Sequence, residues 1–347
     1  MGNRIRVLVV DDSAIVRKIL TEKLAAEPDI EVVGAAPDPF VAREKIVALK
    51  PDVITLDIEM PRMDGLSFLR KLMKYYPMPV VVVSSLSAAG SKVALEAIEA
   101  GAVDVMGKPG GPYSVEDVQV ELAQKIRAAA MARIKRRDGV PPPAQRAPEP
   151  NPPISGRLRR EIVAVGASTG GTEALRILLE PLPKETPPVV VVQHMPAGFT
   201  AAFAHRLNDV CHIEVREAVD GDRLKPGLAL IAPGDYHVVL HRNGAGYTVS
   251  VKGGPKVYHQ RPSVEVLFQS AAEVAGNKAV GIILTGMGKD GAAGLLKMRQ
   301  AGANTIAQDE ATSVVYGMPG EAVRLGAAAK VLPIDRMARG LLEAVMS

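Results

Sequence analysis

The chain has 347 residues, more than one hydrophobic core usually organises, so two domains of ordinary size are expected. Hydrophobic residues make up 47% and charged residues 23%, a balance typical of globular proteins in water. The single cysteine, Cys211, excludes an internal disulfide framework and favours the reducing cytoplasm. The first apolar segment ends at Asp11 and Asp12, too early for a signal-peptide core or a spanning helix, so we expect no membrane insertion.

The net charge of +4 could indicate a nucleic-acid or acidic partner, but much of the basic excess lies in residues 131–158. This stretch has no hydrophobic periodicity and contains seven prolines, which is typical of an extended linker. We therefore expect a first domain over residues 1–130, a Pro-rich basic linker over 131–158 and a second domain over 159–347. Solvated linker charge explains the basic excess without a nucleic-acid partner.

In the first domain, apolar runs alternate regularly with amphipathic stretches. The runs are residues 5–10, 30–36, 52–57, 79–85 and 103–109, and the stretches are 14–26, 38–49, 65–74, 91–99 and 115–130. This alternation predicts an α/β domain with a doubly wound, flavodoxin-like parallel sheet and right-handed crossovers.

The second domain also reads as α/β, with a less regular order. Strands are expected over residues 161–167, 189–194, 212–216, 228–233, 237–240, 247–251, 279–286, 304–308 and 329–333, and helices after Gly170, Gly198, Pro262 and Asp290. The strands in the middle of the domain are spaced for hairpins. We therefore expect a mixed, mainly parallel sheet with an antiparallel hairpin insertion.

Polar residues stand where the strands of the first domain end. Asp11 and Asp12 follow the first strand, Asp57 ends the third, Ser84 ends the fourth and Lys108 follows the fifth. The carboxyl ends of parallel strands lie at one edge of a sheet, where ligands bind. Three carboxylates at that edge repel one another unless a cation is present, and carboxylate oxygens with room for water suit Mg²⁺.

Three further motifs make this set specific. Asp57 is followed by Met60-Pro61 and then by Asp64-Gly65, and Lys108 is followed by Pro109. Together these residues resemble the response-regulator receiver domain across about residues 4–126. Unrelated surface acids on loops are the alternative interpretation.

The receiver resemblance implies a role for each residue of the set. Asp57 would accept a phosphoryl group from a histidine kinase, with Ser84 and Lys108 holding the phosphoryl oxygens as the phosphorylation switch. The implied Mg²⁺ ligands are Asp11, Asp12, Asp57 and the backbone carbonyl of Glu59.

The second domain opens with a strand, a Gly-rich turn and a helix. Gly166-Ala167-Ser168-Thr169-Gly170 fits the nucleophile-elbow pattern G-x-S-x-G, which places the Ser168 hydroxyl near a helix N-terminus. A dinucleotide fingerprint would need an acid at the end of the next strand, which instead ends in Gln193-His194. A phosphate-binding turn with Ser168 as a helix cap remains an alternative for this motif alone.

Two further residues fit a hydrolase. His194 ends the strand after the Ser168 turn, and Asp290 follows the strand at residues 279–286, so both can meet Ser168 at one sheet edge. A serine nucleophile needs a base, and the base needs a carboxylate to orient it. Of the other histidines, His259 precedes a Pro-started helix and could line a substrate cleft.

Six motifs along the second domain carry a closer resemblance. GASTGG, QHMP, APGDYH, HQRPSVEVLF, LTGMGKDG and YGMPGEA occur in this order and are similar to those of the chemotaxis receptor methylesterase family. The resemblance implies that Ser168 is the nucleophile, His194 the general acid/base and Asp290 its orienting carboxylate. It also implies an oxyanion-binding N–H at Met287, with Thr169 close to the nucleophile.

The family resemblance implies a function. The chain would demethylate γ-glutamyl methyl esters of chemoreceptors, and also deamidate glutamines, after phosphorylation by the chemotaxis histidine kinase; the esterase itself needs no cofactor. One alternative is a response regulator with a non-catalytic binding output, and another is a DNA-binding output. The second domain alternates strands with helices and contains no compact helix-turn-helix, which argues against DNA binding.

Overall fold

The computed structural model describes residues 4–85, 87–108, 115–132, 158–244 and 246–347. The chain divides into two compact units, Met1–Pro142 and Pro143–Ser347. The expected linker at 131–158 lies almost wholly outside the described residues, as does Pro109, so the boundaries of the linker stay a prediction. Within the described ranges, no helix is both long and apolar enough to cross a membrane.

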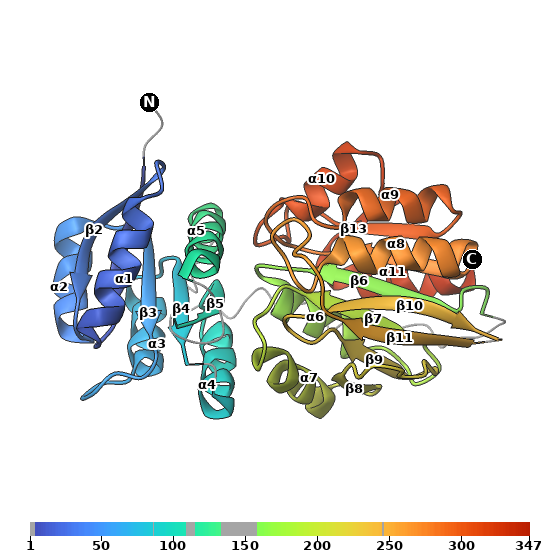
Figure 1. Ribbon diagram of the computed structural model, residues 1–347, viewed down its shortest axis with the longest axis horizontal. Coiled ribbons are helices and arrows are strands. Elements are labelled where there is room, and N and C mark those ends of the chain that lie inside the picture. Colours follow the sequence, from blue (N-terminus) through green and yellow to red (C-terminus); the bar gives the residue numbers. More distant parts are fainter. Residues whose placement is uncertain (1–3, 86, 109–114, 133–157, 245) are drawn as a thin grey trace. The chain divides into compact units, whose positions relative to one another are not determined.

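The N-terminal unit is a five-stranded parallel sheet in the order β2-β1-β3-β4-β5 (Figure 1). Its elements are β1 (Ile5–Val10), α1 (Ala14–Ala25), β2 (Ile30–Ala36), α2 (Pro39–Leu49), β3 (Val53–Asp57), α3 (Gly65–Tyr75), β4 (Val80–Ser84), α4 (Ala88–Glu99), β5 (Asp104–Gly107) and α5 (Val115–Met131). Helices α1 and α5 pack together, as do α3 and α4. The predicted doubly wound sheet is confirmed.

Side-chain caps begin four of these helices. Each cap accepts hydrogen bonds from backbone N–H groups of the first turn, which leaves those donors satisfied close to the strand end. The caps are Ser13, Asp38, Asp64 and Ser87. Because Ser87 caps α4, this helix begins at Ala88, three residues before the expected start. Capped helix starts therefore follow Asp12 and Ser84 within three residues, whereas a loop of seven residues separates Asp57 from α3.

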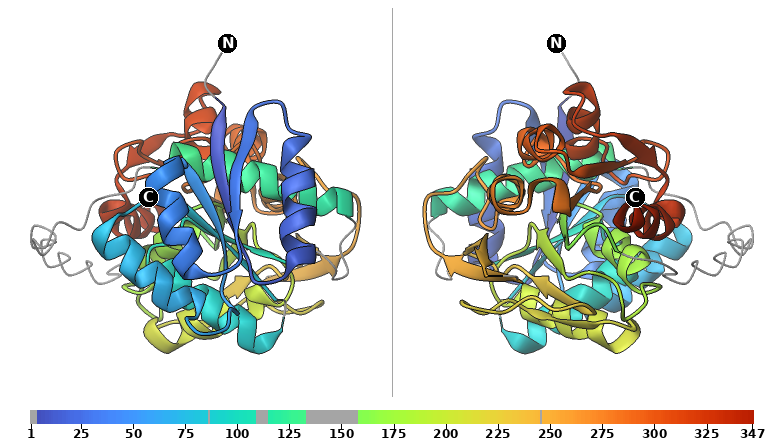
Figure 2. Two further views of the ribbon diagram at one scale, coloured as in Figure 1. Left: turned by 90° about the vertical axis from the view of Figure 1, so that its left-hand side faces the viewer. Right: turned by 90° about the vertical axis from the view of Figure 1, so that its right-hand side faces the viewer.

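The C-terminal unit contains a seven-stranded sheet in the order β14-β13-β12-β6-β7-β9-β8. The strands are β6 (Ile162–Ala167), β7 (Val189–Gln193), β8 (Glu214–Glu217), β9 (Leu228–Ile231), β12 (Ala279–Ile283), β13 (Asn304–Gln308) and β14 (Lys330–Leu332), and a separate antiparallel pair is formed by β10 (His237–Asn243) and β11 (Gly246–Lys252). Figures 1 and 2 show this hairpin as a ribbon apart from the large sheet. The expected hairpin insertion is confirmed.

The expected parallel core is confirmed: all strand pairs of the large sheet are parallel, and the antiparallel strands lie in the separate hairpin. The chain between β8 and β9 does not turn back on itself. It runs along the hairpin instead, where the Gly221 N–H donates to the Val249 carbonyl (2.9 Å) and the Leu224 N–H to the Tyr247 carbonyl (3.0 Å). This detour brings the chain back to start β9 parallel to β8.

Helices cover the large sheet in two layers. They are α6 (Gly171–Leu179), α7 (Phe199–Val210), α8 (Val264–Val274), α9 (Ala292–Gln300), α10 (Met318–Arg324) and α11 (Ile334–Met346), with a short 3-10 turn η1 (Gly276–Lys278). Helix α9 contacts both α8 and α10, and α6 contacts both α7 and α11. The hairpin packs on α8, and its inward side chains belong to the same core. Helices α10 and α11 were not expected from the sequence.

Strand order decides which loops meet in this unit. Strand β6 pairs with β12 on one side and β7 on the other, so the loops that follow these three strands are neighbours at one edge. The Ser168 N–H donates to the Thr285 carbonyl (3.0 Å), and the His194 N–H donates to the Ala167 carbonyl (3.1 Å). The three loops are thus hydrogen-bonded to one another where the strands end.

Candidate active site

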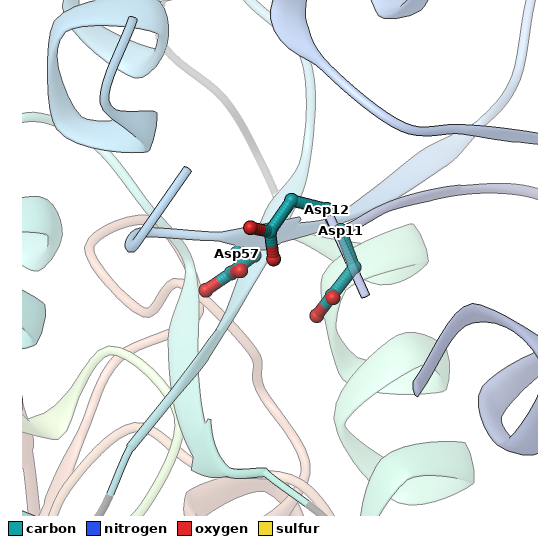
Figure 3. A group of neighbouring side chains, drawn as sticks. All are labelled: Asp11, Asp12 and Asp57. Carbon is teal, nitrogen blue, oxygen red and sulfur yellow. The ribbon is translucent and has the colours of Figure 1, made fainter. Parts of the chain in front are cut away.

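Three carboxylates gather at the carboxyl ends of β1 and β3 in the N-terminal unit (Figure 3). Asp11, Asp12 and Asp57 each offer an oxygen, and these oxygens all lie within 4.8 Å of one another. Asp11 and Asp57 are buried, whereas Asp12 is exposed. Asp11 Oδ2 is buried without a hydrogen-bond partner among the described residues. An open set of hard oxygen ligands at this edge fits a divalent cation.

Lys108 is the cation that the chain itself brings to this cluster. Its Nζ lies 2.7 Å from Asp57 Oδ2 and 3.7 Å from Asp11 Oδ2. Burial raises the pKa of Asp57 to about 6, and the hydrogen bond from Lys108 only partly offsets this effect. Burial also raises the pKa of Asp11, and the charge of Asp12 adds to the rise. Burial favours neutral Lys108, but the hydrogen bond and charge of Asp57 outweigh it and hold the pKa of Lys108 above its usual value.

Ser84 and Glu59 lie beside this cluster with their side chains engaged elsewhere. The Ser84 hydroxyl, buried at the end of β4, donates to the Gly90 carbonyl in α4 (3.3 Å). The Glu59 N–H donates to Asp57 Oδ1 (3.0 Å), while its carboxylate accepts from the Ser85 hydroxyl (2.8 Å). The structure therefore brings the three aspartates and Lys108 together and leaves the Ser84 hydroxyl bonded to α4.

In the C-terminal unit, Ser168 follows β6 directly and opens a tight turn into α6. The Gly171 N–H donates to the Ser168 carbonyl (2.7 Å), and Gly170 has φ 79° and ψ −2°. These are the dihedrals of the third residue of a type II turn, where a positive φ favours glycine. The Gln193 side chain also donates to the Ser168 carbonyl (2.9 Å). The nucleophile candidate is thus held by a turn and by Gln193, the last residue of β7, which His194 follows.

The loop after β12 approaches Ser168 very closely. A Cβ atom at Gly286 would lie 2.6 Å from Ser168 Cβ, so only glycine allows this approach. The next residue, Met287, is half-buried, and its N–H takes no part in the backbone hydrogen bonds that fix this loop within the described residues. Met287 lies two residues after Thr285, whose carbonyl accepts the hydrogen bond from the Ser168 N–H. Thr169, which follows the nucleophile candidate Ser168, is 4% exposed.

His194 and Asp290 form a buried hydrogen-bonded pair. His194 Nε2 lies 2.7 Å from Asp290 Oδ2, and the two residues are 7% and 2% exposed. Because an ionised carboxylate can only accept, Nε2 is the donor to Asp290, and in the neutral ring Nδ1 is then the nitrogen that can accept a proton. His194 Nδ1 is buried and has no hydrogen-bond partner within the described part of the chain.

Asp290 receives further hydrogen bonds from the start of α8. Its Oδ1 accepts from the Ser263 hydroxyl (2.8 Å) and the Glu265 N–H (3.0 Å), and its Oδ2 accepts from the Val264 N–H (2.8 Å). Burial opposes ionisation, but the hydrogen bond and charge of His194 and the donors from α8 outweigh it and hold the pKa of Asp290 below its usual value. A helix N-terminus with free N–H groups is a natural site for an anion.

Sequence reasoning missed this function of Ser263, Val264 and Glu265. These residues lie within the HQRPSVEVLF motif, where the sequence predicts a helix after Pro262 and a cleft residue at His259 but no contact with Asp290. The available signal was Ser263 at the start of a helix, which predicts an N-terminus with free donors but does not reveal which anion they bind.

His259 lies on a separate two-residue turn. Val257 and Gln260 exchange backbone hydrogen bonds (3.0 and 2.9 Å), and Tyr258 and His259 at the tip have φ of 52° and 63°. Both tip side chains are exposed. Lys289 Nζ lies 5.6 Å from the centre of the Tyr258 ring, so the turn stands beside the loop that carries Asp290.

Two kinds of site thus occur in one chain. The parallel 2-1-3-4-5 sheet with a buried aspartate cluster defines a receiver-type unit, and the second unit holds a serine, a histidine and an aspartate at neighbouring strand ends. These features define the class of response regulators whose output unit is an α/β enzyme.

Comparisons with known proteins agree with this class. Residues 7–118 match the response regulator receiver domain family, and residues 163–341 match the CheB methylesterase family. A protein-glutamate methylesterase/protein-glutamine glutaminase of Syntrophus aciditrophicus is 58% identical over 99% of this chain and 100% of its own length. One from Anaeromyxobacter dehalogenans is 54% identical over 98% of this chain and 94% of its own length.

A solved structure resembles the second unit. The CheB methylesterase catalytic domain of Thermotoga maritima has 41% sequence identity and a TM-score of 0.52, covering 53% of this chain and 98% of that one. The chain belongs to the CheB family of protein-glutamate methylesterases/protein-glutamine glutaminases, in which a receiver domain regulates a catalytic domain.

The burial of Asp57 predicts that its charge destabilises the folded N-terminal unit. A folded pKa of about 6 exceeds the ordinary value of 3.8, so the folded state binds this proton more tightly than the unfolded chain does. The stability that the proton contributes is lost as the pH rises through about 6. In buffer without divalent cations at neutral pH, Asp57→Asn is expected to stabilise the unit by on the order of 2 kcal/mol.

Thermal unfolding followed by circular dichroism measures this gain, which should shrink toward pH 4. Asp12→Asn is the matched control, because it removes an exposed carboxylate from the same cluster and should raise the Tm by less. An Asp57→Asn variant that melts below the parent at neutral pH would contradict the expectation.

Proposed function

We propose that this chain is a phosphorylation-activated serine hydrolase that demethylates γ-glutamyl methyl esters on chemoreceptors and deamidates specific receptor glutamines. The observation that carries the proposal is the His194–Asp290 hydrogen bond at the strand ends next to the Ser168 turn, with no hydrogen-bond partner on His194 Nδ1 within the described residues. Family membership supports the same reaction class.

In the proposed mechanism, Ser168 Oγ attacks the ester carbonyl while His194 Nδ1 takes the hydroxyl proton. The negative charge on the carbonyl oxygen is received by the Met287 N–H. The C–O bond to the methoxy group then breaks, His194 returns the proton to it and methanol leaves. Water attacks the acyl-enzyme by the same route and releases glutamate. With a glutamine substrate, the leaving group is ammonia.

Asp290 supports this proton transfer without taking part in it. Donors from His194 and from the start of α8 keep the carboxylate ionised, so Nε2 remains protonated and Nδ1 remains the base. The same negative charge stabilises the imidazolium that forms when Nδ1 accepts the proton. The two ring nitrogens thus have exchanged roles compared with the triad in which the carboxylate binds Nδ1 and Nε2 is the base.

In the receiver domain we propose that Asp57 accepts the phosphoryl group from a histidine kinase. Asp11, Asp12, Asp57 and the carbonyl of Glu59 would hold Mg²⁺, which supplies positive charge to the phosphoryl oxygens. Lys108 would move from Asp57 to a phosphoryl oxygen. Ser84 would exchange its bond to the Gly90 carbonyl for one to the phosphoryl group, which would shift the start of α4.

We further propose that the Tyr258–His259 turn contacts the receptor segment that carries the ester. Two central residues with positive φ are typical of a type I′ turn, which favours Asn-Gly, so bulky side chains there are held against their backbone preference. The turn is anchored by Arg261, whose side chain donates to the Gly254 carbonyl (2.5 Å). Burial, together with the charges of Glu265 and Asp290, raises the pKa of Tyr258, consistent with a position beside the catalytic carboxylate.

The receiver domain is proposed to restrain the esterase until it is phosphorylated. Domains joined by a short proline-rich linker keep a high local concentration of each other, so a weak contact can close over an active site. Phosphorylation at Asp57 would weaken that contact through the face near Ser84 and Lys108 and raise the population of open molecules.

The nucleophile assignment predicts that Ser168→Ala reduces hydrolysis of an activated ester and of methylated receptors by on the order of 10⁶-fold. Stopped-flow measurement should show that the burst of acyl-enzyme disappears as well. Phosphorylation of Asp57 by a small phosphodonor is the control and should be unchanged. More than a tenth of the parental activity in the variant would contradict the assignment, and a parent without a burst would favour a binding-only output.

The proposed receptor contact predicts that Tyr258→Asn combined with His259→Gly lowers kcat/KM for methylated receptors about tenfold or more, the loss of a typical contact cluster. The Tm should stay level or rise, because Asn-Gly suits the turn. The matched control is Tyr75→Asn, which removes a tyrosine that is 73% exposed on the N-terminal unit. Receptor demethylation at the parental rate by the turn variant would exclude the contact.

The restraint by the receiver predicts that deletion of residues 1–140 raises basal receptor demethylation, whereas Asp57→Ala in the full chain leaves it low and abolishes the response to phosphodonor. Released methanol from labelled receptor membranes, with and without Mg²⁺ and phosphodonor, measures both effects. If the isolated catalytic domain is no faster than the unphosphorylated full chain, the receiver must instead activate by organising the site or recruiting the receptor.

A further inference from the structure

Thr285 joins three loops of the catalytic unit through one buried side chain. It lies two residues after β12 and is 1% exposed. Its hydroxyl lies 3.0 Å from the Thr169 carbonyl and 3.2 Å from the Val315 carbonyl, and it accepts a hydrogen bond from the Val315 N–H (3.0 Å). One hydroxyl thus connects the nucleophile turn to the loop before α10.

The backbone of Thr285 makes two further connections. Its carbonyl accepts from the Ser168 N–H (3.0 Å), and its own N–H donates to Gln308 Oε1 (2.8 Å). Gln308 is 1% exposed and its amide donates onward to the Thr312 carbonyl (2.9 Å). Every polar group of Thr285 is therefore engaged, and two of its contacts are to the Ser168–Thr169 turn.

We propose that Thr285 is a positioning residue for the serine hydrolase, and that its hydroxyl sets the distance between Ser168 and the Met287 N–H. The inference rests on the proposed function. Only Gly286 separates Thr285 from Met287, and Gly286 stands against Ser168 with no room for a side chain. Any movement of Thr285 therefore changes the gap between the attacking oxygen and the oxyanion donor directly.

Loss of the hydroxyl should open this gap rather than simply weaken the fold. Valine has the same shape but removes the bond to the Thr169 carbonyl and the acceptor of the buried Val315 N–H. A buried donor that loses its acceptor draws its segment toward another partner or toward water. The two loops that must stay in register for acylation would then separate.

Thr305 provides a matched control in the same core. It lies on β13, is also 1% exposed, and its hydroxyl donates to the Ala327 carbonyl (2.7 Å) and accepts from the Ala329 N–H (3.1 Å). These partners lie before β14, and β13 carries Thr305 near its amino end, away from the edge where Ser168 lies. Thr305→Val therefore removes an equivalent buried hydroxyl without touching the nucleophile turn.

The test compares Thr285→Val, Thr285→Ser and Thr305→Val in the full-length protein. Stopped-flow acylation with an activated ester gives the burst rate and KM, and thermal unfolding gives the Tm. We expect Thr285→Val to slow acylation by roughly 10²-fold with KM little changed, because a misplaced nucleophile costs rate rather than binding. Thr285→Ser should recover most of the rate, and Thr305→Val should lower the Tm similarly but acylate at nearly the parental rate.

Three results would overturn the inference. They are acylation by Thr285→Val at nearly the parental rate, an equal loss of rate in Thr305→Val, and failure of serine to restore the rate. If valine prevents folding, Thr285→Ala removes the same hydroxyl with a smaller side chain and is read in the same way. A parent that shows no Ser168-dependent burst contradicts the proposed function, whereas an active parent with an equally active Thr285→Val contradicts only the positioning role.

Discussion

The hydrogen bonds that converge on the carboxylate of Asp290 are the interaction on which the catalytic unit depends. A buried carboxylate is costly unless donors surround it, and here the donors are His194 and the first turn of α8. The carboxylate is the hydrogen-bond acceptor for N–H groups in the first turn of α8, and these N–H groups in turn stabilise its buried charge. The ionised Asp290 carboxylate therefore orients His194 through Nε2, which leaves Nδ1 as the second ring nitrogen outside this bond. The same carboxylate holds the start of α8 in place.

The receiver domain also buries carboxylates, but it gives them fewer hydrogen-bond donors than Asp290 has. Asp57 and Asp11 are buried and each accepts one backbone hydrogen bond, and within the described residues Lys108 is the cation paired with both. The pKa of Asp57 therefore rises, while that of Asp290 falls. A carboxylate left short of partners is suited to accept a cation and a phosphoryl group, whereas a fully satisfied carboxylate is suited to hold a histidine still.

The strands and the residues at their ends could be predicted from the sequence, because buried parallel strands are short runs rich in β-branched residues and their carboxyl ends lie at a common edge. That rule placed Asp11, Asp57, Ser168 and His194 correctly at strand ends. The mainly parallel sheet was predicted, but the separation of the hairpin from it was not, because the course of the chain between β8 and β9 depends on hydrogen bonds to that hairpin later in the sequence. The donors to Asp290 at the start of α8 lie about 26 residues before it, and no local pattern reveals which anion a helix start will bind. The left-handed turn at Tyr258 was equally hidden, since neither Tyr nor His is typical of such a position.

The hydrogen bonds between Asp290 and the start of α8 link catalytic activity to local unfolding of this helix. The ends of helices open more readily than their centres, and such openings need far less free energy than melting of the whole domain. When the first turn of α8 opens, Asp290 loses the Val264 and Glu265 N–H groups together, and the orientation of His194 loosens with them. The enzyme should therefore lose activity on warming before its fold melts, and a bound substrate that holds the start of α8 closed would protect it from heat.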